Sequence, residues 1–191
     1  MKRVFIIHGW SGSPEGGWLG WLKGALEAEG FKAIAPQMPE ADEPKIETWI
    51  PFLAELVGEP DEDTFFVGHS IGCQTIMRYL QTIYPKKTGG AVFVAGWFNL
   101  KGLEGPDEEK LASSWMTAPI NFEKIKTAAG KFLAILSDTD PYVPIGDAEI
   151  FKEKLGAEVI IETGKGHFTS DDGAADLPIA LEKLLEMAEK K

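Results

Sequence analysis

The chain has 191 residues, of which 44% are hydrophobic, and this length favours one domain with a substantial core. Thirty acidic residues against nineteen basic ones give a net charge of −11, a balance that disfavours binding to nucleic acid or anionic membranes. The apolar runs are far shorter than the ~20 residues that span a bilayer. The one cysteine, Cys73, excludes an intrachain disulfide. We therefore expect a soluble, cytoplasmic protein.

Short runs rich in β-branched residues alternate with segments of helical periodicity. The expected strands are 3–7, 31–35, 64–68, 90–95, 131–137 and 158–162. The expected helices are 18–29, 46–57, 71–84, 146–155 and 174–190. Strand and helix alternation of this kind predicts an α/β fold with a mostly parallel central sheet of about six strands and helices on both faces.

Residues 97–129 interrupt this alternation, because glycines and prolines there are scattered among charged and aromatic residues. We interpret the segment as a short cap or lid within a single domain that covers 1–191. The chain has no internal repeat, low-complexity tract or linker that would mark a second domain.

Residues 68–72 read Gly-His-Ser-Ile-Gly and match the pattern G-x-S-x-G, with Ser70 at its centre. The motif follows an expected strand and precedes an expected helix, which is the setting of a nucleophile elbow in the α/β-hydrolase fold. The alternative is a glycine-rich connection that happens to contain a serine. The context favours Ser70 as a nucleophile.

A serine nucleophile needs a general base, and the sequence offers three histidines. His69 precedes Ser70 on a tight turn and is expected to point away from the hydroxyl, while His8 falls in the first strand-to-helix loop. His167 follows the last expected strand on a glycine-flanked loop. We therefore expect His167 to be the base, although without the serine motif it would be read as an exposed loop histidine.

The acid that orients the histidine follows the serine and precedes the histidine in this fold. Two candidates, Asp138 and Asp140, lie at the end of an expected strand. We favour Asp140, because the ring of Pro141 restricts its backbone, and keep Asp138 as the alternative. The pair does not indicate a calcium loop, since Val143 stands where such a loop needs glycine. No metal is expected.

Two backbone N–H groups are expected to form an oxyanion hole, one from Ile71 after the nucleophile and one from Trp10 in the first loop. Aromatic residues from loops at the same edge of the sheet predict an apolar substrate pocket. The residues expected there are Trp97, Phe98, Trp115 and Phe168. For each of them singly, packing in the core is an equally reasonable interpretation.

Several motifs together resemble the family of small serine hydrolases related to retinoblastoma-binding protein nine and bacterial YdeN. They are His8-Gly9-Trp10, Gln37-Met38-Pro39, Trp49-Ile50-Pro51-Phe52, 68–72, Met77-Arg78-Tyr79, 140–144 and Gly166-His167-Phe168. The resemblance implies a compact α/β-hydrolase fold, shortened at its amino end, and a triad of Ser70, Asp140 and His167. The loop 11–17 varies, so the entrance to the site is not implied. The sequence lacks Leu-x-Cys-x-Glu, and docking to a retinoblastoma-type pocket is not implied either.

The expected activity is that of a carboxylesterase-like serine hydrolase, which cleaves a small-molecule ester through an acyl-enzyme and needs no cofactor. Amide or thioester cleavage and acyl transfer to an acceptor other than water would use the same residues. A different class of function stays open, namely a hydrolase-like module that binds a ligand or a protein without turnover. The acyl chain and the oligomeric state are also open.

Overall fold

A computed structural model describes residues 1–189 and contains one six-stranded sheet in which every strand pairs in parallel. The strands are β1 (Arg3–Ile7), β2 (Lys32–Ile34), β3 (Thr64–His69), β4 (Gly90–Val94), β5 (Phe132–Ser137) and β6 (Glu158–Glu162). Each overlaps an expected strand. The sequence prediction of a mostly parallel α/β sheet is confirmed, and the observed sheet is parallel throughout.

Helices lie between most of these strands. They are α1 (Trp18–Ala28), α2 (Ile46–Val57), α3 (Ile71–Thr82), α4 (Pro106–Thr117), α5 (Phe122–Ala128), α6 (Asp147–Ile150), a π-helical turn (Phe151–Leu155) and α7 (Pro178–Glu189). The expected helix from 174 begins four residues later, where Pro178 stands in the first turn, a position that suits its fixed φ. Its expected end at Lys190 lies outside the described residues.

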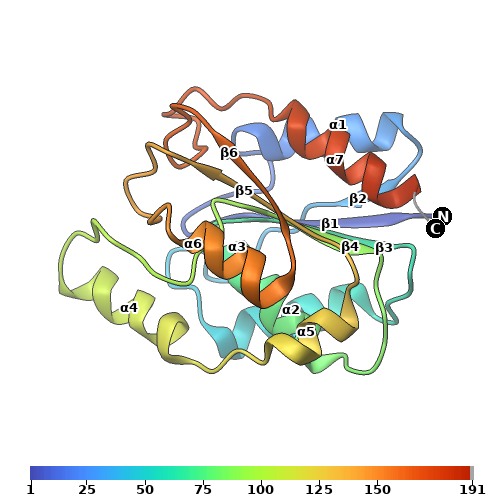
Figure 1. Ribbon diagram of the computed structural model, residues 1–191, viewed down its shortest axis with the longest axis horizontal. Helices are drawn as coiled ribbons and strands as arrows, with labels where there is room; N and C mark the ends of the chain where they lie inside the picture. The colour runs from blue at the N-terminus through green and yellow to red at the C-terminus, as the bar shows by residue number, and fades with distance from the viewer. Residues whose placement is uncertain (190–191) are drawn as a thin grey trace.

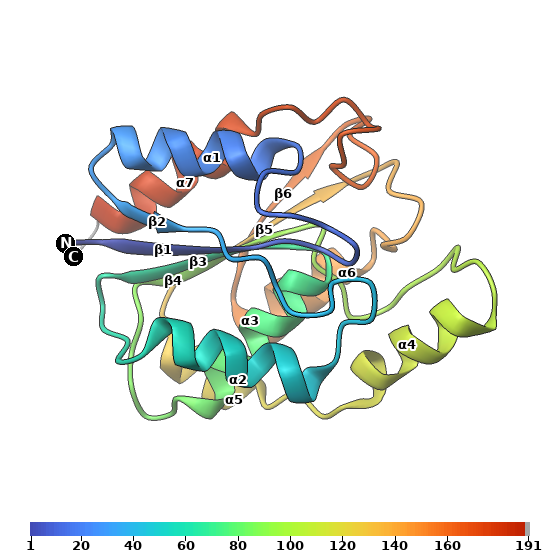
Figure 2. The same ribbon diagram turned by 180° about the vertical axis from the view of Figure 1, so that it is seen from behind.

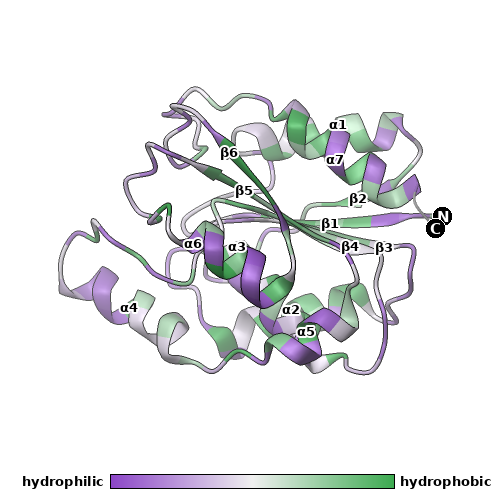
Figure 3. Ribbon diagram, viewed as in Figure 1, coloured by the Kyte–Doolittle hydropathy of each residue, from purple (hydrophilic) through white to green (hydrophobic). Residues whose placement is uncertain are grey.

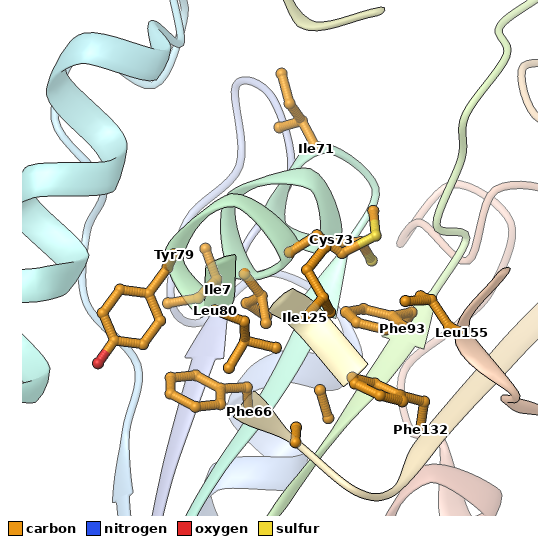
Figure 4. Packing of buried hydrophobic residues seen from close by; sticks show 14 of the residues in the cluster. Ile7, Phe66, Ile71, Cys73, Tyr79, Leu80, Phe93, Ile125, Phe132 and Leu155 are labelled. Carbon is orange, nitrogen blue, oxygen red and sulfur yellow. The ribbon is translucent and has the colours of Figure 1, made fainter. Parts of the chain in front are cut away.

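The two faces of the sheet bury two separate apolar clusters. In β1, Phe5 and Ile7 face one cluster while Val4 and Ile6 face the other, as the alternation of side chains along a strand requires. Helices α1 and α7 cover the second face, whereas α2, α3 and α5 cover the first (Figure 1). Figure 4 shows part of the first cluster. In Figure 3, β5 is coloured mainly hydrophobic, whereas the helices carry both hydrophobic and hydrophilic residues.

The order of the strands, β2-β1-β3-β4-β5-β6, contains a reversal at β1. From β1 the chain first adds β2 on one side and then returns to add β3 on the other. Ligands in open parallel sheets bind at the carboxyl ends of the strands beside such a switch point. The loops that follow β1 and β3 are therefore where the topology alone places a binding site.

The expected cap, 97–129, contains two helices in different settings. Helix α4 lies beyond the carboxyl ends of the strands, apart from the other helices, in both views (Figures 1 and 2). Helix α5 packs against α3 on the face of the sheet. Because α5 buries Ile125 and Ala128 in the first cluster, it belongs to the core. Of the two helices in the expected cap, α4 is the one that lies apart from the others. Within residues 1–189, no helix has the length and apolar character needed to cross a membrane.

Candidate active site

Ser70 stands on the turn between β3 and α3 with a φ of 52°, in the left-handed region that non-glycine residues seldom adopt. The turn brings α3 close to β1. A Cβ atom added to Gly72 would lie 2.3 Å from the carbonyl oxygen of Ile7, so only glycine fits there. This close approach is the physical reason for a small residue two positions after the serine.

The structure brings Ser70, His167 and Asp140 together although they come from three separate loops. Ser70 Oγ lies 2.9 Å from Nε2 of His167, and Nδ1 of His167 lies 2.8 Å from Oδ2 of Asp140. A carboxylate only accepts hydrogen bonds, so Nδ1 carries the proton and Nε2 is free to accept from the serine hydroxyl. This tautomer is the one that a general base for Ser70 requires.

The two neighbouring aspartates have different partners. Asp140 is 3% exposed, and its Oδ1 accepts hydrogen bonds from the backbone N–H groups of Tyr142 at 2.8 Å and Val143 at 2.9 Å. Asp138 is exposed, and its Oδ1 accepts instead from the N–H of Gly164 at 2.8 Å. Asp140 is therefore the one that is held against the imidazole. Within residues 1–189, no cluster of three or more His, Cys, Asp or Glu side chains is arranged to hold a metal ion.

The other two histidines are buried and bond backbone groups. His8 Nε2 accepts from the N–H of Met38 at 3.0 Å, so its proton is on Nδ1, which donates to the carbonyl of Gly9 at 2.7 Å. Burial lowers the pKa of His8. His69 Nε2 donates to the carbonyl oxygen of His167 at 2.8 Å, and burial lowers its pKa to about 4. Both rings are neutral at neutral pH.

The loop after β1 lies against the nucleophile turn, since a Cβ atom on Gly9 would be 3.4 Å from Cβ of Ser70. The indole N–H of Trp10 donates to the carbonyl of Asp42 at 2.9 Å. In the described part of the chain, the backbone N–H groups of Trp10 and Ile71 have no acceptor. Both residues line the cavity beside Ser70.

A cavity of about 450 Å³ opens over Ser70, a volume typical of a site for a small molecule. Its apolar wall consists of Trp97, Leu100, Leu103, Leu111 and Ala112 from the segment that follows β4. The catalytic candidates Ser70 and His167 also line the cavity, together with the loop after β1. Of the four aromatic residues expected in the pocket, only Trp97 lines it.

Phe98, Trp115 and Phe168 do not line the cavity, and the expectation for these three is corrected. Phe98 packs against Phe151 in the first cluster, with ring centroids 4.7 Å apart. Trp115 is fully buried and donates from its indole to the carbonyl of Pro44 at 2.9 Å. Phe168 has a φ of 56°, which turns its side chain into the second cluster instead of toward the serine.

The sequence did not point to Tyr142 or to the leucine wall, by which we mean the three leucines of the apolar wall. The Tyr142 ring meets the His167 imidazole edge-on, with centroids 5.1 Å apart, and lines the same cavity. Its position two residues after Asp140 was the available signal. Leu100, Leu103 and Leu111 gave no comparable signal, because leucines on an amphipathic segment usually indicate core packing.

This fold and this arrangement of residues define the class of α/β hydrolases. The chain belongs to the serine hydrolase family, whose sequence model matches residues 4–186. YdeN from Bacillus subtilis (strain 168) is 31% identical over 192 residues, which cover all of this chain and 98% of YdeN. Serine hydrolase RBBP9 from Rattus norvegicus is 30% identical over 157 residues, 82% of this chain and 80% of RBBP9.

Solved structures agree on the fold. The crystal structure of the ydeN gene product from B. subtilis superimposes with a TM-score of 0.90 at 28% identity, with both chains covered completely. A structure published with carboxylesterases of the Thaumarchaeon Nitrososphaera gargenis has a TM-score of 0.74 at 16% identity and covers 99% of this chain and 91% of its own. The predicted α/β-hydrolase fold and the resemblance to the YdeN and RBBP9 family are confirmed.

Proposed function

We propose that this protein hydrolyses small carboxylic esters with a neutral, apolar acyl group, with Ser70 as nucleophile, His167 as general base and Asp140 as the orienting acid. The observation that carries the proposal is the continuous hydrogen-bonded series from Ser70 Oγ through the imidazole to the buried Asp140 carboxylate. Membership of the serine hydrolase family supports it.

In the proposed reaction, Ser70 Oγ attacks the ester carbonyl carbon while His167 Nε2 takes the hydroxyl proton. The negative charge that develops on the carbonyl oxygen is stabilised by the free backbone N–H groups of Trp10 and Ile71. His167 then gives its proton to the leaving alkoxide, and the ester C–O bond breaks. A water molecule, activated by the same imidazole, hydrolyses the acyl-enzyme and regenerates Ser70.

The wall of the cavity supports the choice of substrate. Trp97, Leu100, Leu103, Leu111 and Ala112 give an acyl group an apolar surface, and burying it there is favourable by about 25 cal/mol per Å². Among the lining residues Glu108 is the one carboxylate, and no lysine or arginine lines the cavity formed by the described residues. A substrate with a negatively charged acyl group would meet no compensating charge. Carboxylesterases among the structural relatives are consistent with this substrate class.

A fluorophosphonate probe, which reacts with activated serines, tests the proposal. We expect stoichiometric labelling that maps to Ser70, loss of labelling in Ser70→Ala at an unchanged melting temperature, and release of p-nitrophenol from short acyl esters by the wild-type protein. His167→Ala should lower kcat by about 10³ or more, because the members of a triad act as a unit. Labelling of a different residue, or binding of the esters without release of p-nitrophenol, would contradict the proposal.

A further inference from the structure

The loop that carries His167 is a tight turn whose geometry needs external support. Gly164, Gly166 and Phe168 all have positive φ, of 70°, 53° and 56°. For a residue with a side chain such as Phe168, this conformation costs on the order of 1–3 kcal/mol and persists only where the surroundings hold it. The contacts that hold this loop therefore decide where the imidazole lies.

Two side chains bond the backbone of His167, one from later in the same loop and one from the end of β3. Its N–H donates to Oδ2 of Asp172 at 2.9 Å, and its carbonyl oxygen accepts from Nε2 of His69 at 2.8 Å. The next carbonyl, of Phe168, accepts from the indole N–H of Trp18 at 3.1 Å. The same Oδ2 of Asp172 also accepts from the backbone N–H and the hydroxyl of Thr169, at 3.0 and 2.7 Å.

The geometry points to Asp172 and His69 as positioning residues that hold the backbone of His167 from both sides and so fix its imidazole between Ser70 and Asp140. This inference rests on the proposed function, in which His167 is the general base. Neither residue contacts the nucleophilic Oγ in the proposed reaction, so both act through His167. Asp172 approaches the loop so closely that a Cβ atom on Gly166 would lie 2.1 Å from its Oδ1.

Both groups have the protonation state that these hydrogen bonds need. Partial burial raises the pKa of Asp172, but the hydrogen bonds from Thr169 and His167 outweigh it and leave the pKa below its ordinary value, so the side chain is an anionic acceptor. Burial keeps the His69 ring neutral, and its one proton lies on Nε2, since the carbonyl of His167 only accepts.

His69 also connects the two halves of the site. It immediately precedes Ser70 at the end of β3, whereas its acceptor lies in the loop after β6. If the loop that carries His167 moved away from the turn that carries Ser70, this hydrogen bond would break. A misplacement of about 1 Å between reacting groups can cost about 10² in rate, so the loss should appear in kcat rather than in binding.

The first test compares Asp172→Ala, Asp172→Asn and Asp171→Ala. Asp171 is an exposed neighbour without a side-chain hydrogen bond in the described part of the chain, so its variant controls for the loss of charge. We expect Asp172→Ala to lower kcat by about 10- to 100-fold at nearly unchanged KM. Asp172→Asn keeps a carbonyl oxygen and should recover most of the loss. Asp171→Ala should behave as wild type.

The second test compares His69→Gln, whose amide N–H replaces the imidazole donor, with His69→Leu, which has none. We expect a smaller loss of kcat in His69→Gln. In the double variant His69→Leu/Asp172→Ala the losses should be less than multiplicative, because both residues hold the backbone of the same residue, His167. Melting temperatures and complete, slower labelling of Ser70 would show that the variants are folded.

Two sets of outcomes separate this inference from the proposed function. If Ser70 is labelled and the esters are hydrolysed, but Asp172→Ala has wild-type kcat, the positioning role is refuted and the function stands. A loss confined to KM, or an equal loss in Asp172→Ala and Asp172→Asn, refutes it as well. If wild-type protein neither reacts with the probe nor turns over esters, the proposed function itself fails.

Discussion

At the scale of single residues, the three histidines illustrate how the bonding partner of each ring sets its role. His8 and His69 each bond backbone groups, and burial lowers the pKa of both rings and keeps them neutral. His167 instead bonds two side chains, a hydroxyl and a carboxylate. It is the one of the three whose ring lies within hydrogen-bonding distance of a serine hydroxyl.

The two aspartates of the loop after β5 give a prediction at the same scale. Asp140→Asn should lower kcat by about 10⁴, because the amide cannot stabilise the imidazolium and disfavours the required tautomer. Asp138→Asn should cost less than about tenfold, because the amide oxygen still accepts from the N–H of Gly164. Steady-state kinetics of both variants with one p-nitrophenyl ester are the measurement. The reverse ranking would move the orienting role to Asp138.

At the scale of elements, the segment that walls the cavity is held at both ends by buried polar side chains. Asp147 accepts from the backbone N–H of Asn99 at 2.9 Å and from its side-chain amide at 2.7 Å. Arg78 in α3 donates to the carbonyls of Trp115 and Ala118, the latter at 3.0 Å. Burial lowers the pKa of Arg78 to about 10, so it remains charged at neutral pH. The end of the wall near Trp115 is thus anchored to α3, the helix that follows Ser70.

Substitutions in this segment should therefore divide into two kinds. Leu111→Ala should raise activity on longer acyl esters relative to acetate at little cost in stability, because Leu111 is half-buried and faces the cavity. Trp115→Ala should instead lower stability by about 3–5 kcal/mol, because its side chain is buried in the core.

A chain-length series of p-nitrophenyl esters together with urea unfolding measures both effects. Leu56→Ala, on the exposed face of α2, is the matched control for Leu111→Ala. The interpretation of Leu111 as a wall residue would be abandoned if its variant and the control gave the same acyl-chain profile. A change of profile without loss of stability in Trp115→Ala would restore the sequence expectation for that residue.

At the scale of the whole molecule, the buried histidines link stability to pH. Burial lowers the pKa of His69 from 6.5 to about 4, so the unfolded chain binds a proton there at a higher pH than the folded one. The stabilisation is fully present above pH 6.5 and is lost as the pH falls toward 4. His8 acts in the same direction. The net charge of −11 acts in the opposite direction, because lowering the pH reduces repulsion among the acidic groups.

Urea unfolding at pH 7 and pH 5 measures this linkage. The free energy of unfolding should fall by roughly 2 kcal/mol in the wild-type protein through His69. His69→Gln removes the titrating group, so its free energy of unfolding should depend less on pH over the same range. Equal pH dependence in the two proteins would show that His69 titrates alike in the folded and unfolded states.

The sequence by itself determined the order of the strands along the chain, most of the helices between them and the group of candidate residues. It did not determine α4 and α5, which lie in the segment expected to be an irregular cap. Strands and helices are read from periodicity, which is local, and β1, α2 and β6 were located to the residue. The sequence offers three histidines as candidates for the general base, and two of them, His8 and His69, were expected to lie where they do not serve as the base. Motif context and chain order thus predicted Ser70, Asp140 and His167 as the catalytic candidates.

The tertiary structure alone decided which side chains surround them. Phe168 was expected in the pocket, but its positive φ turns it into the core, and no local sequence pattern specifies that conformation. The leucine wall and the hydrogen bonds of Asp172 and His69 to His167 likewise depend on contacts between distant segments. Local patterns determine which residues form a strand or a helix, whereas the orientation of a side chain in a loop is set by the residues that pack against it.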